Sequence, residues 1–133
     1  MAETAAAPAQ AADDAYTLMI VDDSNLIRRQ IERMTRTERL RVIGTAGNGE
    51  DAVRMFGELR PDLVTMDITM PNMDGVTALK AIRGNDATAR IIMCSAMGQE
   101  SLVVEAITSG ARDFVAKPFE ADRVVEAVNK ALA

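Results

Sequence analysis

The sequence has no histidine, no tryptophan and a single cysteine, Cys94, among its 133 residues. Without histidine, neither a Ser/His/Asp triad, a Cys/His dyad nor a histidine-ligated metal site can form. One cysteine cannot form an internal disulfide, which is typical of a protein from a reducing, cytosolic compartment. Any chemistry must therefore use carboxylates, hydroxyls, lysine or arginine.

Long apolar runs and basic clusters are also missing. No run approaches the roughly 20 apolar residues of a membrane-spanning helix. Residues 1–16 are rich in alanine and lack the basic start and continuous apolar segment of a signal peptide, so we expect a disordered extension. The 20 acidic residues outnumber the 15 basic ones, for a net charge of −5. This balance argues against nucleic acid as a partner and against membrane insertion.

From residue 17 to residue 133, short apolar runs alternate with longer segments of helical spacing, and 48% apolar residues suffice for the core of one domain. The predicted strands are Leu18–Val21, Val42–Thr45, Leu63–Met66, Ile91–Cys94 and Phe114–Ala116. Residues expected near helix starts are Ser24, Asn48 and Glu120–Asp122, and those near helix ends are Gly84 and Gly110. Because the strands are mostly continuous apolar runs, we expect helices on both faces of a doubly wound five-stranded parallel sheet, an α/β fold.

Polar residues stand where the predicted strands end. Asp22 and Asp23 follow the first strand and Asp67 the third, while Ser95 follows the fourth and Lys117 the fifth. Taken singly, each is also compatible with a turn, a helix cap or a solvated loop. Because the carboxyl ends of parallel strands meet at one rim, where such sheets bind ligands, we expect these side chains to converge.

Three neighbouring carboxylates raise one another's pKa unless a cation lies between them, so the acidic group predicts a metal ion. Oxygen ligands without histidine or thiolate favour Mg²⁺. With Lys117 and Ser95 nearby, such a site suits a phosphoryl group, whose phosphorus Asp67 would attack. The sequence lacks a Gly-x-x-x-x-Gly-Lys-Ser/Thr loop, so the phosphoryl group is expected to come from another molecule.

Residues 17–133 resemble the receiver domain of two-component response regulators, most closely the stand-alone CheY-like members of bacterial chemotaxis. The resemblance rests on the segments Met19–Ser24, Asp67–Gly75, Cys94–Met97 and Phe114–Phe119, which are highly specific in this order and spacing. It implies a flavodoxin-like sheet with the strand order 2-1-3-4-5. It also implies that a histidine kinase supplies the phosphoryl group and that Asp67 becomes an aspartyl phosphate.

The resemblance further implies the ligands of both groups. Mg²⁺ would be held by the side chains of Asp23 and Asp67 and by the backbone carbonyl of Thr69, with Asp22 acting largely through a bound water. The phosphoryl oxygens would be contacted by Lys117, Ser95 and Ala96.

A conformational switch is implied as well. On phosphorylation, Ser95 would move toward the phosphoryl oxygen and Phe114 would turn into the space left behind. This movement would change the face formed by the fourth helix, the fifth strand and the fifth helix, where an output protein binds. Phe114 replaces the tyrosine of some chemotaxis members, so a motor contact that needs the hydroxyl is not expected, and a plain core aromatic is an alternative interpretation. Thr69 and Met97 occupy positions that tune dephosphorylation.

Two other functions use some of the same residues. Gly47–Ala52 reads Gly-x-Gly-x-x-Ala between a strand and a helix, a dinucleotide-binding pattern, but that function leaves Asp22, Asp23 and Lys117 unused. A haloacid-dehalogenase-type phosphatase would also use an aspartate nucleophile with Mg²⁺. It expects a second acid two residues later, where Thr69 stands.

We therefore expect a regulatory phosphoacceptor and not an enzyme, beyond its own phosphotransfer and autodephosphorylation. The sequence ends soon after the fifth predicted helix, so we expect a single-domain response regulator that signals by protein contact. A phosphate shuttle or sink in a phosphorelay is the alternative. We expect a cytoplasmic monomer. The arginines of the first helix, Arg28, Arg29, Arg33 and Arg36, form either a solvated face or part of the kinase docking surface.

Overall fold

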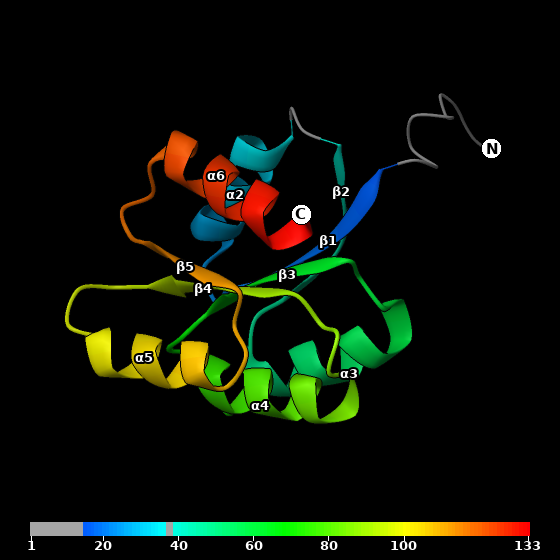
Figure 1. Cartoon of the computed structure of the whole chain (residues 1–133), viewed down its shortest axis with the longest axis vertical. Helices are drawn as coiled ribbons and strands as arrows, with labels where there is room; N and C mark the ends of the chain where they lie inside the picture. The colour runs from blue at the N-terminus through cyan, green and yellow to red at the C-terminus, as the bar shows by residue number, and fades with distance from the viewer. Residues whose placement is uncertain (1–14, 37–38) are drawn as a thin grey trace.

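The computed structural model describes residues 15–36 and 39–133, so most of the predicted extension lies outside the described residues (Figure 1). Strands and helices alternate along the chain. In order they are β1 (Tyr16–Val21), α2 (Asn25–Thr35), β2 (Leu40–Ala46), α3 (Gly49–Leu59), β3 (Leu63–Asp67), α4 (Gly75–Asn85), β4 (Ile91–Ser95), α5 (Glu100–Thr108), β5 (Asp113–Ala116) and α6 (Ala121–Leu132). The longest of these helices has 12 residues, and none in the described ranges is long and apolar enough to cross a membrane.

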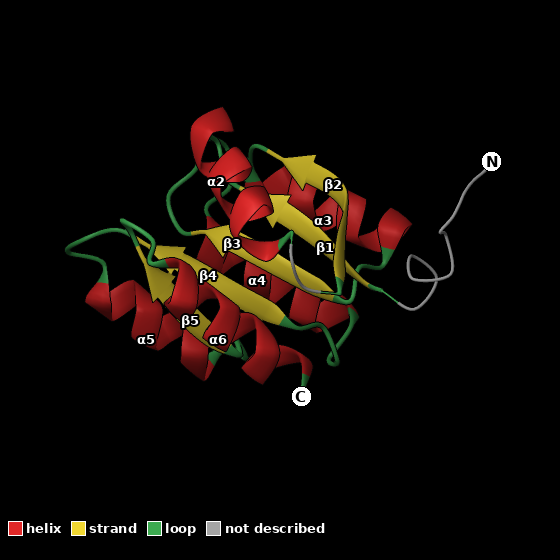
Figure 2. Ribbon diagram, turned by 90° about the horizontal axis from the view of Figure 1, so that it is seen from above, coloured by secondary structure: helices red, strands yellow, loops and turns green. Residues whose placement is uncertain are grey.

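The strands form one parallel sheet with the order β2-β1-β3-β4-β5, as Figure 2 shows, which confirms the predicted doubly wound fold. The chain moves outward from β1 to β2 and then returns past β1 to β3, so the strand order reverses between β1 and β3. Val21 of β1 pairs with Met66 of β3. The aspartates that follow these two residues therefore stand side by side at the reversal, where doubly wound sheets bind their ligands.

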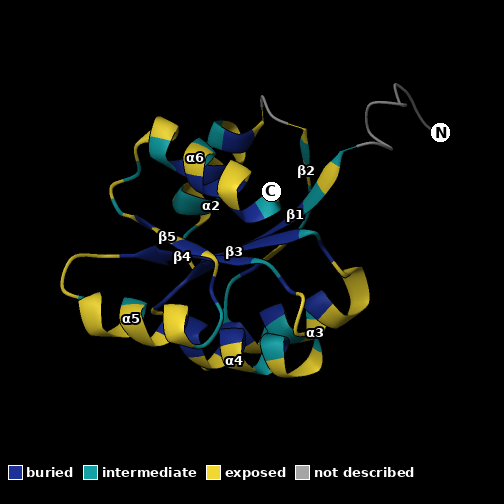
Figure 3. Ribbon diagram, viewed as in Figure 1, coloured by how far each residue is buried: buried dark blue, intermediate teal, exposed yellow. Residues whose placement is uncertain are grey.

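Helices cover both faces of the sheet. In Figure 1, α2 and α6 lie above it and α3, α4 and α5 lie below it. Along β1, Leu18 and Ile20 belong to the core under α2 and α6, whereas Met19 and Val21 belong to the core against the other three helices. Each fully buried side chain of this kind contributes about 1.5–3 kcal/mol to stability. β3 and β4 are accordingly dark blue in Figure 3, as is β1 after its first two residues, so the aspartates project from the end of a buried sheet.

The edge strands are less covered than the sequence predicts. In β5, Asp113 and Val115 are buried, whereas Phe114 and Ala116 are exposed. Val115 packs in the core under α6, and α5 leaves the opposite side of β5 open. An edge strand has a neighbour on one side only, and the helices pack over the centre of the sheet. The continuous coverage predicted from the apolar runs holds for β1, β3 and β4 in their inner parts. It is wrong for β5 and also for β2, in which only Ala46 is buried.

The N-terminal boundary also differs by one residue. We expected Tyr16 in the extension, but the structure places it at the start of β1. Its backbone N–H donates to the carbonyl of Arg39 at 2.8 Å, and it pairs with Leu40. A β2 strand that begins at Leu40, before the predicted Val42, supplies this extra partner.

The predicted caps hold in part. The side chains of Ser24 and Asn48 accept hydrogen bonds from the backbone three residues on and cap α2 and α3. Glu120 precedes α6 without a side-chain capping bond. Gly110 follows α5 with φ of 111°, a conformation that favours glycine. Gly84 does not end its helix, because α4 continues to Asn85.

Candidate functional site

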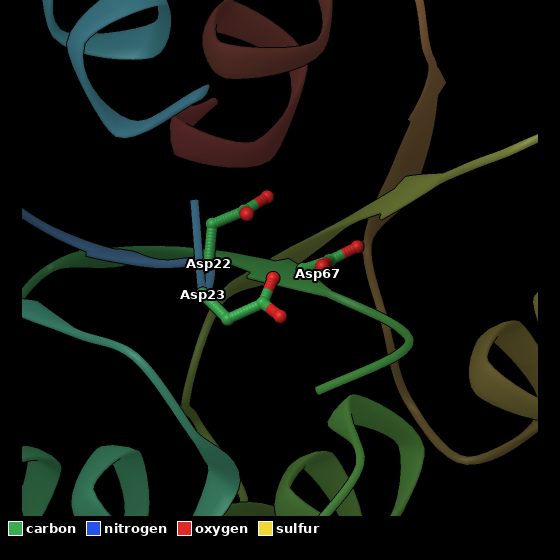
Figure 4. A group of neighbouring side chains, drawn as sticks. All are labelled: Asp22, Asp23 and Asp67. Atoms are coloured by element: carbon green, nitrogen blue, oxygen red, sulfur yellow. The ribbon is translucent and has the colours of Figure 1, made fainter. Parts of the chain in front are cut away.

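Three carboxylates meet at the reversal point of the sheet (Figure 4). Asp22 and Asp23 follow β1, and Asp67 ends β3. One oxygen from each lies within 4.8 Å of the others. Asp22 and Asp67 are buried, whereas Asp23 is exposed, so a ligand from solvent reaches the group from the side of Asp23.

Lys117, which follows the edge strand β5, extends its side chain to these three carboxylates, called the acidic cluster below. Its Nζ donates to Asp22 Oδ2 at 3.0 Å and to Asp67 Oδ1 at 3.1 Å. The Lys117 N–H donates to the carbonyl of Ser95 at 2.7 Å, which fixes the backbone from which the side chain extends. Lys117 thus contacts the acidic cluster, as its position after the fifth predicted strand indicates, and is not a solvated loop lysine.

The charges of the cluster shift the pKa values of two groups. Burial and the neighbouring Asp22 raise the pKa of the Asp67 carboxyl, and the hydrogen bond from Lys117 only partly opposes them. Burial disfavours the Lys117 ammonium, but its hydrogen bonds to Asp22 and Asp67 outweigh this and raise the pKa of Lys117. The lysine therefore remains charged, whereas Asp67 lacks enough nearby positive charge.

The turn after β1 holds Asp22 in place. Asp22 Oδ1 accepts from the Ser24 N–H at 2.9 Å, while Ser24 Oγ accepts from the Ile27 N–H at 3.2 Å. The capped turn and the acidic site, which the sequence presents as alternatives, therefore coexist. Since Asp22 has Ser24 on one oxygen and Lys117 on the other, Asp23 and Asp67 are the more available ligands.

The loop after β3 returns tightly behind Asp67. The Gly75 N–H donates to the Ile68 carbonyl at 2.7 Å, and a Cβ at Gly75 would lie 1.9 Å from the Asp67 carbonyl oxygen. Asp74 caps α4 by accepting from the Thr77 N–H at 2.8 Å. The Gly75 contact fixes the backbone of Asp67 and leaves Thr69 exposed on the loop.

Gln99, which the sequence did not single out, connects two loops beside the cluster. Its Nε2 donates to Thr69 Oγ1 at 2.7 Å, and its Oε1 accepts from the Ala96 N–H at 2.7 Å. Gln99 stands at the N-cap position of α5 without making a side-chain capping bond. An isolated glutamine before a helix carries no sequence pattern that would have revealed this contact.

Ser95 and Phe114 line one groove of about 500 Å³ between β5 and α5. Ser95 is buried, while Phe114 is 38% exposed. Met97 lies on the same groove with 96% of its surface exposed. The structure thus brings the two predicted switch residues together and places Phe114 outside the core, which contradicts its interpretation as a plain core aromatic.

Arg123 of α6 anchors β5 and was also missed from the sequence. It donates to Asp113 at 2.9 and 3.3 Å and to the Phe114 carbonyl at 2.7 Å, and its guanidinium lies 6.0 Å from the centroid of the Phe114 ring. Burial opposes ionisation of Asp113, but the hydrogen bonds from Arg123 and the Phe114 N–H outweigh it and lower the Asp113 pKa. Arg123 therefore holds the segment that carries Phe114.

The glycine pattern of the dinucleotide alternative is used for packing. Asn48 accepts from the Asp51 N–H at 2.8 Å and caps α3. The Gly49 N–H donates to the Met73 carbonyl at 2.9 Å, and a Cβ at Gly49 would lie 2.5 Å from that oxygen. The loop after β3 thus fills the helix N-terminus at which a dinucleotide phosphate would bind.

The donor set fits a hard divalent cation. Three carboxylates face the Lys117 ammonium, and the Arg28 guanidinium donates to the Asp22 carbonyl, so these charged groups together leave a net negative charge in a partly buried place. Carboxylate oxygens on an accessible rim are the protein ligands that Mg²⁺ takes together with waters. Burial and the neighbouring Asp22 raise the pKa of Asp67, and a bound cation would favour its ionised form.

Comparisons with known proteins agree with this geometry. The response regulator receiver domain family matches residues 18–129. The chemotaxis protein CheY of Bacillus subtilis (strain 168) is 56% identical over 118 residues, which cover 89% of this chain and 98% of that protein. The chemotaxis protein CheY of Thermotoga maritima is 50% identical over 113 residues, 85% of this chain and 94% of that protein.

Among solved structures, a chain of the CheX–CheY–BeF3–Mg²⁺ complex from Borrelia burgdorferi superposes with a TM-score of 0.84 and 38% identity, covering 89% of this chain and 90% of that one. The chain belongs to the response regulator receiver domain family and is closely related to the CheY proteins of chemotaxis.

Proposed function

We propose that this protein is a CheY-like response regulator that accepts a phosphoryl group on Asp67 and signals by phosphorylation-dependent contact with an output protein. The observation that carries the proposal is the grouping of Asp67 with Asp22, Asp23 and Lys117 at the reversal point of the sheet. The close relation to CheY proteins supports chemotaxis as the pathway and a histidine kinase as the phosphodonor.

In the proposed transfer, a carboxylate oxygen of Asp67 attacks the phosphorus of the kinase phosphohistidine. The new O–P bond forms as the P–N bond breaks, and the bonding electron pair stays on the imidazole nitrogen, so no other reactant is consumed. Lys117 exchanges its bond to Asp67 for one to a phosphoryl oxygen, and Ser95 and the Ala96 N–H contact the others. Mg²⁺, held by Asp23, Asp67 and the Thr69 carbonyl, would neutralise charge on the phosphoryl oxygens.

The groove between β5 and α5 supports a switch at Ser95 and Phe114. Phe114 is 38% exposed beside about 500 Å³ of open space, so its ring has room to turn inward once Ser95 moves. The turn would alter the face of α5, β5 and α6, to which the output protein would bind. Thr69 and Met97, on the two loops at the rim, would tune access of hydrolytic water.

The remaining parts of the proposal concern the whole chain. The receiver domain would comprise residues 16–133, one residue more than the sequence indicates, because Tyr16 belongs to β1. We place the protein in the cytoplasm as a monomer without nucleic-acid partners, and we assign it no enzymatic activity beyond its own phosphotransfer and autodephosphorylation.

Intact-mass measurement after incubation with acetyl phosphate and Mg²⁺ tests the proposal. The protein should gain one acid-labile phosphoryl group, and Asp67→Asn should gain none. Asp74→Asn is the matched control, because it makes the same change on the exposed loop after β3 and asparagine also caps helices. A phosphoryl group on Asp67→Asn would contradict the assignment. So would the absence of any gain, if beryllofluoride binding excludes rapid hydrolysis as the reason.

A further inference from the structure

The Gln99 carboxamide joins the two loops that flank the phosphoacceptor. It accepts from the Ala96 N–H and donates to the Thr69 hydroxyl, both at 2.7 Å. These are good distances for hydrogen bonds of neutral groups. The residue is half-buried, whereas Ala96 and Thr69 are exposed. Water could satisfy either exposed partner, so the bridge does more to fix the relative position of the loops than to satisfy buried groups.

The bridge occupies a donor that the proposed function needs. A backbone N–H has one proton and makes one well-aligned hydrogen bond. In the structure the Ala96 N–H points to Gln99 Oε1, whereas with a phosphoryl group on Asp67 it would donate to a phosphoryl oxygen. The two bonds are therefore mutually exclusive, and an anionic acceptor makes the stronger one.

We propose that Gln99 is a latch that stabilises the unphosphorylated conformation and that the phosphoryl group on Asp67 releases. This inference rests on the proposed function and adds a positioning residue to it. Gln99 touches no reacting atom and acts through Ala96 and Thr69. The latch lowers the affinity of the resting protein for the phosphoryl group, because its bond to Ala96 must break before the new bond forms.

The position of Gln99 links the latch to the output face. Gln99 is the residue immediately before α5, and it lines the groove that Ser95 and Phe114 also line. The chain between Ala96 and Gln99 is short and exposed, and it includes Gly98 with φ of 87°. Release of the side chain therefore frees the segment 96–98 to follow Ser95 while α5 stays folded.

The test is the affinity for beryllofluoride in the presence of Mg²⁺, measured by calorimetry on the full chain, together with the thermal midpoint without either ligand. Gln99→Ala should bind beryllofluoride about two- to tenfold more tightly, since one competing hydrogen bond is removed. Its thermal midpoint should be unchanged or slightly lower. If Gln99 had only a structural role, Gln99→Ala would lower both the affinity for beryllofluoride and the thermal midpoint.

Two further variants separate the parts of the latch. Gln99→Glu keeps an acceptor for the Ala96 N–H and adds a negative charge near the incoming anion, so it should bind beryllofluoride more weakly than the parent. Thr69→Val removes only the other end of the bridge and should give a smaller gain in affinity than Gln99→Ala. Gln30→Ala is the matched control, because it makes the same change on α2, at the other face of the sheet, and should leave the affinity unchanged.

The outcomes distinguish the latch from the function on which it rests. If the parent protein binds no beryllofluoride and gains no phosphoryl group, the proposed function fails. If the parent binds beryllofluoride and Gln99→Ala binds it equally or more weakly, the latch is wrong and the function stands. Equal effects of Gln99→Ala and Gln99→Glu would likewise overturn the latch, because the two variants should shift the affinity in opposite directions.

Discussion

At the scale of single residues, Lys117 serves two requirements that oppose each other. Its ammonium donates to Asp22 and Asp67 at 3.0 and 3.1 Å, which stabilises two buried carboxylates. The same positive charge repels a divalent cation that uses those carboxylates. Burial and the neighbouring Asp22 raise the pKa of Asp67, and the hydrogen bond from Lys117 opposes them only in part. Lys117 and a metal ion would therefore compete for the same carboxylates.

Replacement of this lysine should therefore separate metal binding from phosphoryl binding. Lys117→Met keeps much of the side-chain length without the charge. We expect roughly tenfold tighter Mg²⁺ binding at pH 8, because the variant removes the repulsion between the Lys117 ammonium and the metal ion. Two charges a few ångströms apart interact by several kcal/mol at an effective dielectric constant near 20, and solvent screening reduces this value. Beryllofluoride should bind more weakly, since its cationic partner is lost. Calorimetric titration with each ligand measures both effects.

The control for this variant is Lys80→Met, since Lys80 is an exposed lysine of α4 that pairs with Glu105. It should change neither affinity. Weaker Mg²⁺ binding by Lys117→Met would show that Lys117 organises the carboxylates more than it competes with the cation.

The charged residues at strand ends could be predicted from the strand pattern, and the loop residues Thr69, Ala96 and Met97 only from the family resemblance. Asp22, Asp67 and Lys117 follow from the rule that parallel strands end at one rim. Gln99 and Arg123 carry no such signal, because each is an isolated polar residue whose partners lie on other elements. Only tertiary contacts determine what such a side chain meets.

At the scale of elements, α4 contains two glycines with opposite physical roles. Gly75 begins the helix directly behind Asp67, where a Cβ would lie 1.9 Å from the Asp67 carbonyl oxygen. Gly84 lies in the last turn, where a Cβ would meet nothing within 4 Å. The sequence predicted a helix end at Gly84, but a glycine in an exposed last turn can also be an internal residue, and the cap falls at Asp86.

Alanine at these two positions should change stability in opposite directions. Gly75→Ala should lower the free energy of unfolding by about 2 kcal/mol or more, because the backbone must move to relieve the overlap. The surviving folded protein should bind beryllofluoride poorly, since Asp67 moves with its carbonyl. Gly84→Ala should raise the free energy of unfolding by about 0.5–1 kcal/mol through helix propensity. Urea unfolding curves test both, and a stabilising Gly75→Ala would refute the packing argument.

The burial of an edge strand could not be predicted from the sequence. The apolar run at Phe114–Ala116 gave the right strand but the wrong environment, because an apolar sequence does not tell whether a helix covers both sides of an edge strand. The fold uses that uncovered side of β5 as the groove between β5 and α5.

At the scale of the whole molecule, the parallel sheet gathers residues from distant parts of the chain. Asp22 and Lys117 are 95 residues apart in sequence and joined by a hydrogen bond. Strand identity and strand-end chemistry were enough to predict the doubly wound sheet and this rim, whereas the strand order was implied by the family resemblance. The charge distribution around the rim is a separate property of the molecule. Of the four arginines named in the first predicted helix, Arg28 donates to the Asp22 carbonyl, whereas Arg29 and Arg33 are exposed on α2.

These two exposed arginines provide the last prediction, which concerns association of the whole molecule with its kinase. Since the protein has a net charge of −5, exposed arginines on α2, the helix that begins two residues after Asp23, can orient an approaching partner of complementary charge. Arg29→Gln with Arg33→Gln should slow phosphotransfer from the cognate kinase about three- to tenfold at low salt, and less at high salt as screening removes the difference. Phosphorylation by acetyl phosphate should not change, because a small donor needs no docking face.

Arg41→Gln with Arg54→Gln, on β2 and α3, removes the same charge at other exposed positions and should leave both rates unchanged. Equal slowing with both donors would place the effect in the acidic cluster itself, and equal slowing by the control pair would assign it to net charge alone.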